Sequence, residues 1–190
     1  MRAKSAELIY KLATEEAEFD QIYELNYRTF VEEIPQHEIS STRRLVDKFH
    51  DQNTYVICLQ RGALMGMLAL RGQRPFSLDQ KLPDLDSFLP TGYRILEVRL
   101  LAVEKKYRGL RGGRILKGML ALLKEYGVAR GYDLGIISGT TRQLGLYRHL
   151  GFVAFGPLVG AGDACYQPMY VSLESFDAAE RKNAHAASFV

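Results

Sequence analysis

The residues best suited to binding a charged ligand lie in one short stretch, RGLRGGR, in the middle of the chain. Arginine supplies positive charge and paired hydrogen bonds to phosphate, whereas glycine lets the backbone approach a ligand closely. The first backbone N–H groups of a helix are unpaired and favour an anion. The stretch therefore predicts a cradle for a phosphorylated ligand. Its members are Arg108, Gly109, Leu110, Arg111, Gly112, Gly113 and Arg114.

The segments on either side of this stretch are predicted to position it. Residues 95–103 form an apolar run of strand length, and residues 113–129 carry apolar side chains at helical spacing. Gly131 lies just beyond that helix, where a C-terminal glycine is common. The alternative interpretation of the stretch is a basic surface turn that only caps the helix.

The rest of the chain alternates between strand-like and helix-like segments. We expect a helix over 15–34, where apolar residues recur at helical spacing, and shorter helices over 41–50 and 141–150. Further strands are expected at 7–12, 54–60, 63–71, 134–138, 153–155 and 166–173, with a hairpin turn at Arg61-Gly62. The order predicts one α/β (α+β) domain over residues 1–190, with a core at about 7–173, a tail at 175–190 and a right-handed crossover through the helix at 113–129.

Two motifs in this order resemble those of the GNAT N-acyltransferase superfamily. The segment RLLAVEKKYRGLRGGRIL is similar to its acyl-CoA-binding motif, in which a strand leads into Q/R-x-x-G-x-G/A and a helix. Arg108 and Gly113 occupy the outer positions, whereas Arg111 stands where the middle glycine is expected. Further along, LYRHLGF at 146–152 resembles the Y-x-x-x-G-F signature of the same superfamily.

The resemblance implies both a fold and a donor. The fold is a mixed, mostly antiparallel central sheet with helices on both faces. The donor is acetyl-CoA or another acyl-CoA, used as a co-substrate without a metal. The strand residues Leu101, Ala102 and Val103 would pair with the pantetheine arm beside a bulge, and the loop from Arg108 to Arg114 would hold the pyrophosphate.

The same resemblance implies candidates for the chemical step. An amine must lose a proton to attack a thioester, either to a carboxylate or to water, and Glu97 is the candidate carboxylate. Tyr147 is the candidate acid for the departing thiolate. Each has a simpler explanation: Glu97 pairs with Arg94 or Arg99 on the exposed side of the strand, and Tyr147 is a core aromatic residue.

A narrower resemblance lies near the N-terminus. The segment at 27–33, YRTFVEE, looks like a region of N-acyl amino acid synthases and acyl-homoserine lactone synthases, and Asp47 and His50 fit the same pattern. Those enzymes take long acyl chains, often from acyl carrier protein. A long chain needs an apolar tunnel, and five residues of the segment 72–94 either line one or pack that segment onto the core. They are Phe76, Leu78, Leu82, Phe88 and Leu89.

Three functions follow from these patterns. The first is an acyl-CoA-dependent N-acyltransferase, acetyl being the expected acyl group, that acts on a small amine or amino acid. The second is an acyl-carrier-protein-dependent synthase of N-acyl amino acids or signal molecules. The third is a non-catalytic module that senses CoA or binds a partner.

Composition and charge indicate which partners and which cellular location to expect. The 190 residues carry a net charge of +3, and the basic residues form one loop rather than a stripe, which argues against nucleic acid as a partner. The apolar runs are too short to span a bilayer, and the two cysteines have no metal-ligand spacing, so we expect a cytoplasmic protein. The apolar segment at 167–173 is a candidate surface for a homodimer.

Overall fold

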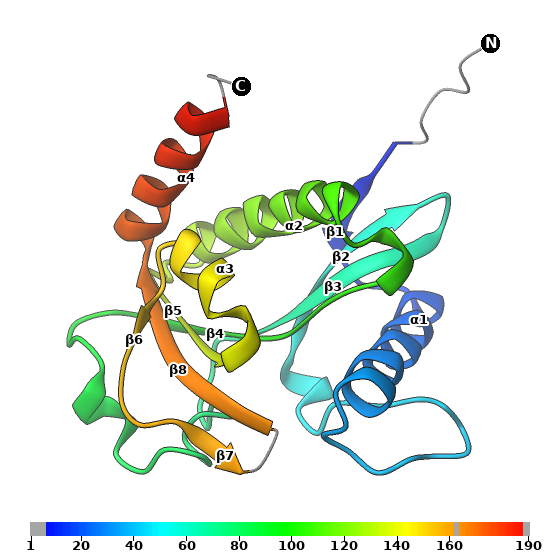
Figure 1. The fold of residues 1–190 in the computed structure, drawn as a ribbon, viewed down its shortest axis with the longest axis horizontal. Helices are drawn as coiled ribbons and strands as arrows, with labels where there is room; N and C mark the ends of the chain where they lie inside the picture. The colour runs from blue at the N-terminus through cyan, green and yellow to red at the C-terminus, as the bar shows by residue number, and fades with distance from the viewer. Residues whose placement is uncertain (1–6, 162–163, 188–190) are drawn as a thin grey trace. The chain divides into compact units, whose positions relative to one another are not determined.

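The computed structural model describes residues 7–161 and 164–187, which form two compact units (Figure 1). The first unit comprises the described residues up to Leu70 together with Arg99–Tyr126. The second comprises Arg71–Val98 and the described residues from Gly127 onward. The expectation of one domain over the whole chain stays a prediction.

Within the described residues, eight strands make up a mixed, mostly antiparallel sheet, which confirms the predicted fold class. In the first unit, β1 (Ile9–Leu12), β2 (Thr54–Gln60) and β3 (Ala63–Arg71) follow one another and β3 neighbours β4 (Ile95–Val103). In the second unit the order is β4, β5 (Leu134–Thr140), β8 (Ala164–Ser172) and β6 (Val153–Ala154), and β7 (Val159–Ala161) also pairs with β8. β4 and β5 are parallel, as the predicted crossover requires.

Two long helices cover the first unit. α1 (Glu16–Tyr27) packs its buried Ile22 and Leu25 into a cluster with inward residues of β2 and β3. α2 (Leu110–Ala129) packs at Gly66 of β3, where an added Cβ atom would lie 3.0 Å from Ile115 Cγ2 and 3.3 Å from Met119 Cε. Figure 1 shows α1 and α2 on opposite sides of β2 and β3. The close approach at Gly66 therefore fixes the position of α2, the helix that begins at the predicted phosphate cradle.

The helix predicted over 15–34 is present, but it changes type before its end. After α1 the chain continues as a π-helix, η1 (Arg28–Glu33), whose end is marked by a hydrogen bond from Ile34 N–H to the Thr29 carbonyl, 3.0 Å long. π-Helical turns are rare and are frequent at functional sites. The apolar spacing alone predicts the length of the helix but not this widening.

The prediction of a helix over 41–50 is wrong. Arg43 has a left-handed φ of 52°, which a continuous right-handed helix excludes, and Leu45 N–H donates to the carbonyl of Tyr23 in α1 instead of to its own turn. Only the short 3₁₀ turn η2 (His50–Gln52) forms at the end of this range. Long-range partners therefore override the local helical pattern.

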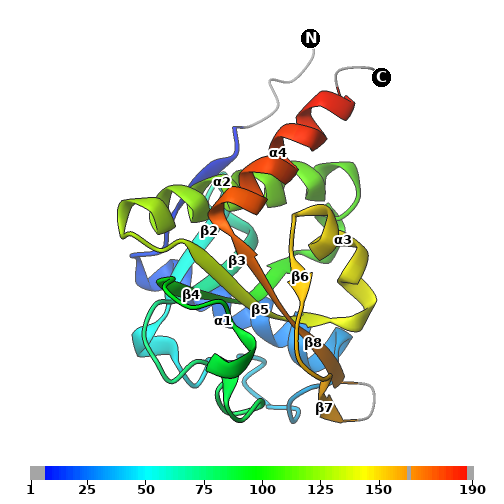
Figure 2. The same ribbon diagram turned by 90° about the vertical axis from the view of Figure 1, so that its left-hand side faces the viewer.

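In the second unit, most of the segment 72–94 lies in the core. Apart from the turn η3 (Leu85–Phe88) it is irregular, as predicted, and it is drawn in shades of green in the lower half of Figure 2. Phe88 is 40% exposed, whereas most of the predicted tunnel residues are buried in a cluster with β5 residues. The interpretation that they pack the segment onto the core is confirmed for these buried members: Phe76, Leu78, Leu82 and Leu89.

The remaining elements follow the predicted order with small differences. The predicted helix at 141–150 is a 3₁₀ turn, η5 (Thr141–Gln143), followed by α3 (Leu144–His149). β7 was not predicted from the sequence, and most of the tail forms α4 (Leu173–Ala187), which continues directly from β8 (Figure 1). Gly151 lies against α4, since an added Cβ atom would be 2.9 Å from the Ser175 carbonyl oxygen.

The packing of α2 on β3 is testable through Gly66. Replacing Gly66 with Val places methyl groups against Ile115 and Met119, and we expect a loss of about 1–3 kcal/mol in the free energy of unfolding. Urea denaturation followed by circular dichroism measures this loss. Ala63→Val, at the exposed start of the same strand, is the matched control and should change stability little. Equal stability of both variants would contradict the close approach.

Candidate active site

The glycine-arginine loop forms the entry to α2. The turn η4 (Lys105–Tyr107) precedes it, and Gly109 adopts a φ of +89°, which favours glycine. α2 begins at Leu110, three residues earlier than predicted, and Gly113 N–H already donates to the Gly109 carbonyl at 3.2 Å. Gly112 and Gly113 thus lie in the first helical turn, where the helix dipole attracts an anion, although the N–H of Gly113 itself is taken by the Gly109 carbonyl.

The two helical glycines differ in the space beside them. A Cβ atom on Gly112 would lie 3.3 Å from the Tyr107 carbonyl oxygen, so this position is close-packed. A Cβ atom on Gly113 would meet nothing within 4 Å. Gly113 is exposed, and its bare backbone fits the close approach of a phosphate group. The side chains of Leu110 and Arg111 lie outside the described residues, so their predicted role stays a prediction.

Arg108 has a protein partner that the sequence does not reveal. Its guanidinium forms two hydrogen bonds with the Glu33 carboxylate, at 2.6 and 3.1 Å, and its Nε donates to the Val103 carbonyl at 2.9 Å. Glu33 ends the π-helix, and Arg28 at its start pairs with Glu104 at 2.7 Å. Two ion pairs therefore join the π-helix to the connection between β4 and α2. An anion that approaches Arg108 meets a guanidinium already paired with a carboxylate.

β4 carries the irregularity that the predicted bulge requires. Leu100 has a φ of +53°, which is uncommon for a residue with a Cβ atom and signals a local break in the strand. The next three residues are the ones predicted to pair with a pantetheine arm. Ala102 is buried in the cluster with α1, whereas Leu101 and Val103 are half-buried. Their pairing with a ligand stays a prediction.

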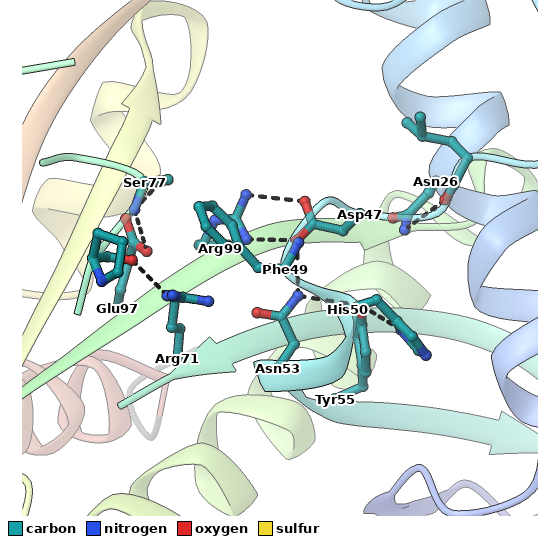
Figure 3. Close-up of polar contacts among 12 residues, drawn as sticks. Asn26, Asp47, Phe49, His50, Asn53, Tyr55, Arg71, Ser77, Glu97 and Arg99 are labelled. Atoms are coloured by element: carbon teal, nitrogen blue, oxygen red, sulfur yellow. Dashed lines mark hydrogen bonds and ion pairs between the residues drawn. The ribbon is translucent and has the colours of Figure 1, made fainter. Parts of the chain in front are cut away.

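Glu97 lies in the interior of the second unit and not on the exposed side of the strand. Its carboxylate is fully buried and accepts hydrogen bonds from Ser77 N–H at 2.8 Å and Ser77 Oγ at 2.6 Å (Figure 3). A third hydrogen bond comes from Leu78 N–H at 3.1 Å. Donors of this kind stabilise a charged carboxylate in a buried position. Glu97 therefore anchors the turn that begins at Ser77, and its role as a base stays a prediction.

Tyr147 lies in α3 and is packed against β5. Its ring covers Gly139, where an added Cβ atom would lie 2.8 Å from the ring, and it meets the Phe152 ring edge-on at 6.1 Å. Burial raises the pKa of the Tyr147 phenol, although a hydrogen bond with Thr140 lowers it in part. The phenol consequently stays protonated at neutral pH, which is the state that an acid needs.

The first unit holds a polar cluster of which the sequence resemblance named only Asp47 and His50. Asp47 receives two hydrogen bonds from Arg99, at 2.7 and 3.0 Å, and one from Asn53 at 2.9 Å (Figure 3). His50 lies between two phenols, with Nε2 2.9 Å from Tyr23 Oη and Nδ1 3.1 Å from Tyr55 Oη. Because Asn53 also donates to Tyr55 Oη at 3.2 Å, these side chains form one connected network.

Burial and charge set the ionisation of this cluster. Burial alone raises the pKa of the Asp47 carboxyl, but hydrogen bonds and charge from Arg99 outweigh it and hold that pKa below its ordinary value. Burial raises the pKa of Tyr55 to about 12. At neutral pH the cluster therefore holds an ionised Asp47–Arg99 pair beside neutral phenols.

The predicted site residues divide between the two units. Leu101–Arg114 belongs to the first unit, whereas Glu97 and Tyr147 belong to the second. Among residues 7–161 and 164–187, no group of three His, Cys, Asp or Glu side chains is placed to hold a metal ion. Within the same ranges, no helix is both long and apolar enough to cross a membrane.

Comparison with known families identifies the chain. The sequence model described as N-acyl amino acid synthase FeeM matches residues 21–164. The chain belongs to the FeeM family. The match includes the π-helix, the Asp47 cluster and the glycine-arginine loop, so it covers both sequence resemblances described above. No curated protein matches the chain.

Solved structures place the FeeM-family chain in the GNAT fold. The CoA-dependent acyl-homoserine lactone synthase BjaI, solved with SAM and isopentyl-CoA, superposes with a TM-score of 0.75 at 19% identity, covering 93% of this chain and 89% of BjaI. FeeM from uncultured soil microbes gives 0.71 at 15% identity, with 92% and 95% covered. An acyl-CoA N-acyltransferase from Pseudomonas aeruginosa gives 0.59 at 15% identity, with 87% and 99% covered. The protein is an acyltransferase with a GNAT-like fold.

The buried Asp47–Arg99 pair predicts a pH-dependent stability. Because the folded pKa of Asp47 is lowered, its stabilising contribution is present above the unfolded pKa of about 3.9 and is lost as the pH falls through the folded value. We expect Asp47→Asn to cost about 3–5 kcal/mol at neutral pH, since Arg99 keeps its charge without a carboxylate. Below about pH 4 the difference from wild type should shrink. Urea unfolding across this range measures it, and a constant difference would contradict the assignment.

Proposed function

We propose that this protein is an N-acyltransferase that moves an acyl group from acyl-CoA to the primary amine of a small molecule, with an amino acid as acceptor. The observation that carries the proposal is the match of residues 21–164 to the N-acyl amino acid synthase family. The exposed backbone at Gly113, at the start of a 20-residue helix, supports a pyrophosphate-bearing donor. BjaI supports the same class of donor, because its structure holds isopentyl-CoA.

The proposed reaction is a direct transfer. The neutral amine nitrogen attacks the thioester carbonyl carbon, and a C–N bond forms as the C–S bond breaks. The amine proton leaves to a base, and the departing thiolate receives a proton to become the free thiol. Positioned acids and bases accelerate such proton transfers by about 10²–10⁴-fold.

Residues of this chain have separate roles in the proposal. The first turn of α2 holds the pyrophosphate through its N–H groups, and Leu101–Val103 pair with the pantetheine arm. Tyr147 gives the proton to the thiolate, which its raised pKa permits at neutral pH. The amine proton leaves to Glu97 or to water; because the Glu97 carboxylate is fully buried and already accepts three hydrogen bonds, these contacts favour the route through water.

The donor has two candidates. CoA carries the pyrophosphate that suits the loop, whereas membership of the FeeM family favours the second candidate, a long acyl chain on acyl carrier protein. Release of thiol should be measured with acetyl-CoA, long-chain acyl-CoA and acylated carrier protein, each with a panel of amino acids and amines. Transfer from any donor supports the proposal. Binding of CoA without transfer would favour a sensor, and neither binding nor transfer would contradict the acyltransferase function.

The cradle is tested by filling the open space at Gly113. Gly113→Leu projects a side chain over the first turn of α2 without meeting the protein, so the fold should persist while affinity for acyl-CoA falls at least 10-fold. Calorimetric titration with acyl-CoA measures the loss, and circular dichroism checks the fold. Ala121→Leu is the control, because it places the same side chain at an exposed position further along α2. Full affinity in Gly113→Leu would show that phosphate binds elsewhere.

The proposed acid is tested by removing one hydroxyl. Tyr147→Phe keeps the ring that covers Gly139, and we expect kcat to fall by about 100-fold with little change in the KM for the donor. Steady-state thiol release with the preferred donor separates the two constants. The tyrosine should matter less for a donor with a more acidic thiol, because that thiolate departs without a proton. An unchanged kcat would assign Tyr147 to packing alone.

A further inference from the structure

The side chain of Arg108 leaves the backbone beside the first turn of α2. Its Cβ atom lies 4.0 Å from the position that a Cβ atom on Gly112 would take. The side chain is 42% exposed, so a ligand in solution can reach it. A guanidinium adds a full charge and paired donors to the positive end of a helix dipole. Arg108 is therefore placed to meet a phosphate group that approaches this turn.

Most of the hydrogen-bonding capacity of Arg108 is already used within the first unit. Glu33 accepts one hydrogen bond from each terminal nitrogen, and the Val103 carbonyl accepts the third from Nε. These bonds use three of the five N–H groups that a guanidinium carries. Phosphate binds arginine best through two parallel N–H groups, and Glu33 holds the fork formed by Nη1 and Nη2. A phosphate therefore has to compete with Glu33 for this fork.

The π-helix keeps Glu33 close to the loop even when its ion pair is open. Arg28, at the start of the π-helix, pairs with Glu104 at 2.7 Å, and Glu104 N–H donates to the Met65 carbonyl of β3 at 2.9 Å. This tie to the sheet does not involve Arg108. A carboxylate displaced from Arg108 consequently stays nearby and repels an anion bound there.

The exposure of the Glu33–Arg108 pair makes displacement feasible. The Glu33 side chain is 24% exposed, and ion pairs that water can reach add little net stability because water solvates the separated groups. A pyrophosphate carries more negative charge than a carboxylate, and the N-terminus of α2 attracts it further. Pyrophosphate can therefore take the guanidinium, but with a lower affinity than an unpaired arginine would give.

We propose that Glu33 is a specificity-determining residue for the donor. Its carboxylate occupies Arg108 and so lowers the affinity for donors that carry a pyrophosphate, whereas donors without one are unaffected. This inference rests on the proposed function and adds a determinant of donor choice to it. Neutralising Glu33 removes both the competition for the fork and the repulsion of the bound phosphate.

Binding of CoA and its fragments tests the inference without turnover. Dephospho-CoA keeps the pyrophosphate of CoA, whereas pantetheine has none, and saturation-transfer NMR titrations compare the three ligands. We expect Glu33→Gln to bind CoA and dephospho-CoA about 10-fold or more tightly than wild type, the effect of one hydrogen bond to a charged group. Affinity for pantetheine should not change. Circular dichroism checks that the fold persists.

Glu32→Gln is the matched control. It removes the same charge from the same π-helix, but the Glu32 carboxylate pairs with Arg43 at 2.6 Å and not with the loop. This variant should bind all three ligands as wild type does. An equal gain of CoA affinity in Glu32→Gln would overturn the specific role of Glu33.

A double substitution separates competition for Arg108 from general repulsion. In an Arg108→Gln background, Glu33→Gln should raise CoA affinity far less than it does in wild type, because no guanidinium is left to release. An equal gain in both backgrounds would show that Glu33 only repels phosphate, and it would overturn the inference.

Three further results would overturn the inference. They are a Glu33→Gln variant with unchanged CoA affinity, one that binds CoA more weakly, and one that gains affinity for pantetheine as well. Thiol release is measured separately with the same proteins. Tighter CoA binding by Glu33→Gln without thiol release from any donor would contradict the proposed function, while the role of Glu33 would stand. Thiol release with unchanged CoA affinity would do the reverse.

Discussion

The parallel pairing of β4 with β5 is the constraint on which the arrangement of the donor loop depends. Parallel neighbours need a long crossover, and α2 provides it between Val103 and Leu134. The crossover places the first turn of α2 after the end of β4, with the turn η4 between them, so the N-terminus of the helix follows a strand after a short connection. Gly66 allows the helix to lie close to β3, which holds that first turn in place.

Ion pairs in the first unit differ in how much they contribute to the stability of the fold. The pairs Arg28–Glu104 and Arg108–Glu33 are partly exposed, and such pairs stabilise a fold by about 0–1 kcal/mol. Their effect is positional, because they tie the π-helix to the loop before α2. The pair of Asp47 and Arg99 is largely buried, so breaking it is far more costly. The network around His50 thus fixes an irregular loop that has few regular backbone hydrogen bonds.

Local patterns in the sequence predict the regular parts of this molecule well. The hairpin at Arg61-Gly62 and the limits of β4 follow from turn chemistry and apolar runs, and the structure confirms them. The helix expected at 41–50 fails because its polar groups are bound by residues far along the chain, such as Arg99. The partner of Arg108 is equally hidden, since Glu33 lies 75 residues away and no local pattern links the two. Motif spacing predicts the glycine cradle and the role of Tyr147, which stay predictions, but it gives no sign of the hydrogen bonds that hold Glu97.

The burial of the segment 72–94 limits which of its positions can accept substitutions. In many enzymes a long apolar loop is a variable lid that changes freely with the substrate. Here Phe76 and Leu78 belong to the same core as the sheet beneath them, so a change of size there is felt as a change in stability. Only exposed members of the segment, such as Phe88, can vary without disturbing that core. Natural or engineered changes in acyl-chain preference are therefore expected to accumulate outside the buried part of this segment.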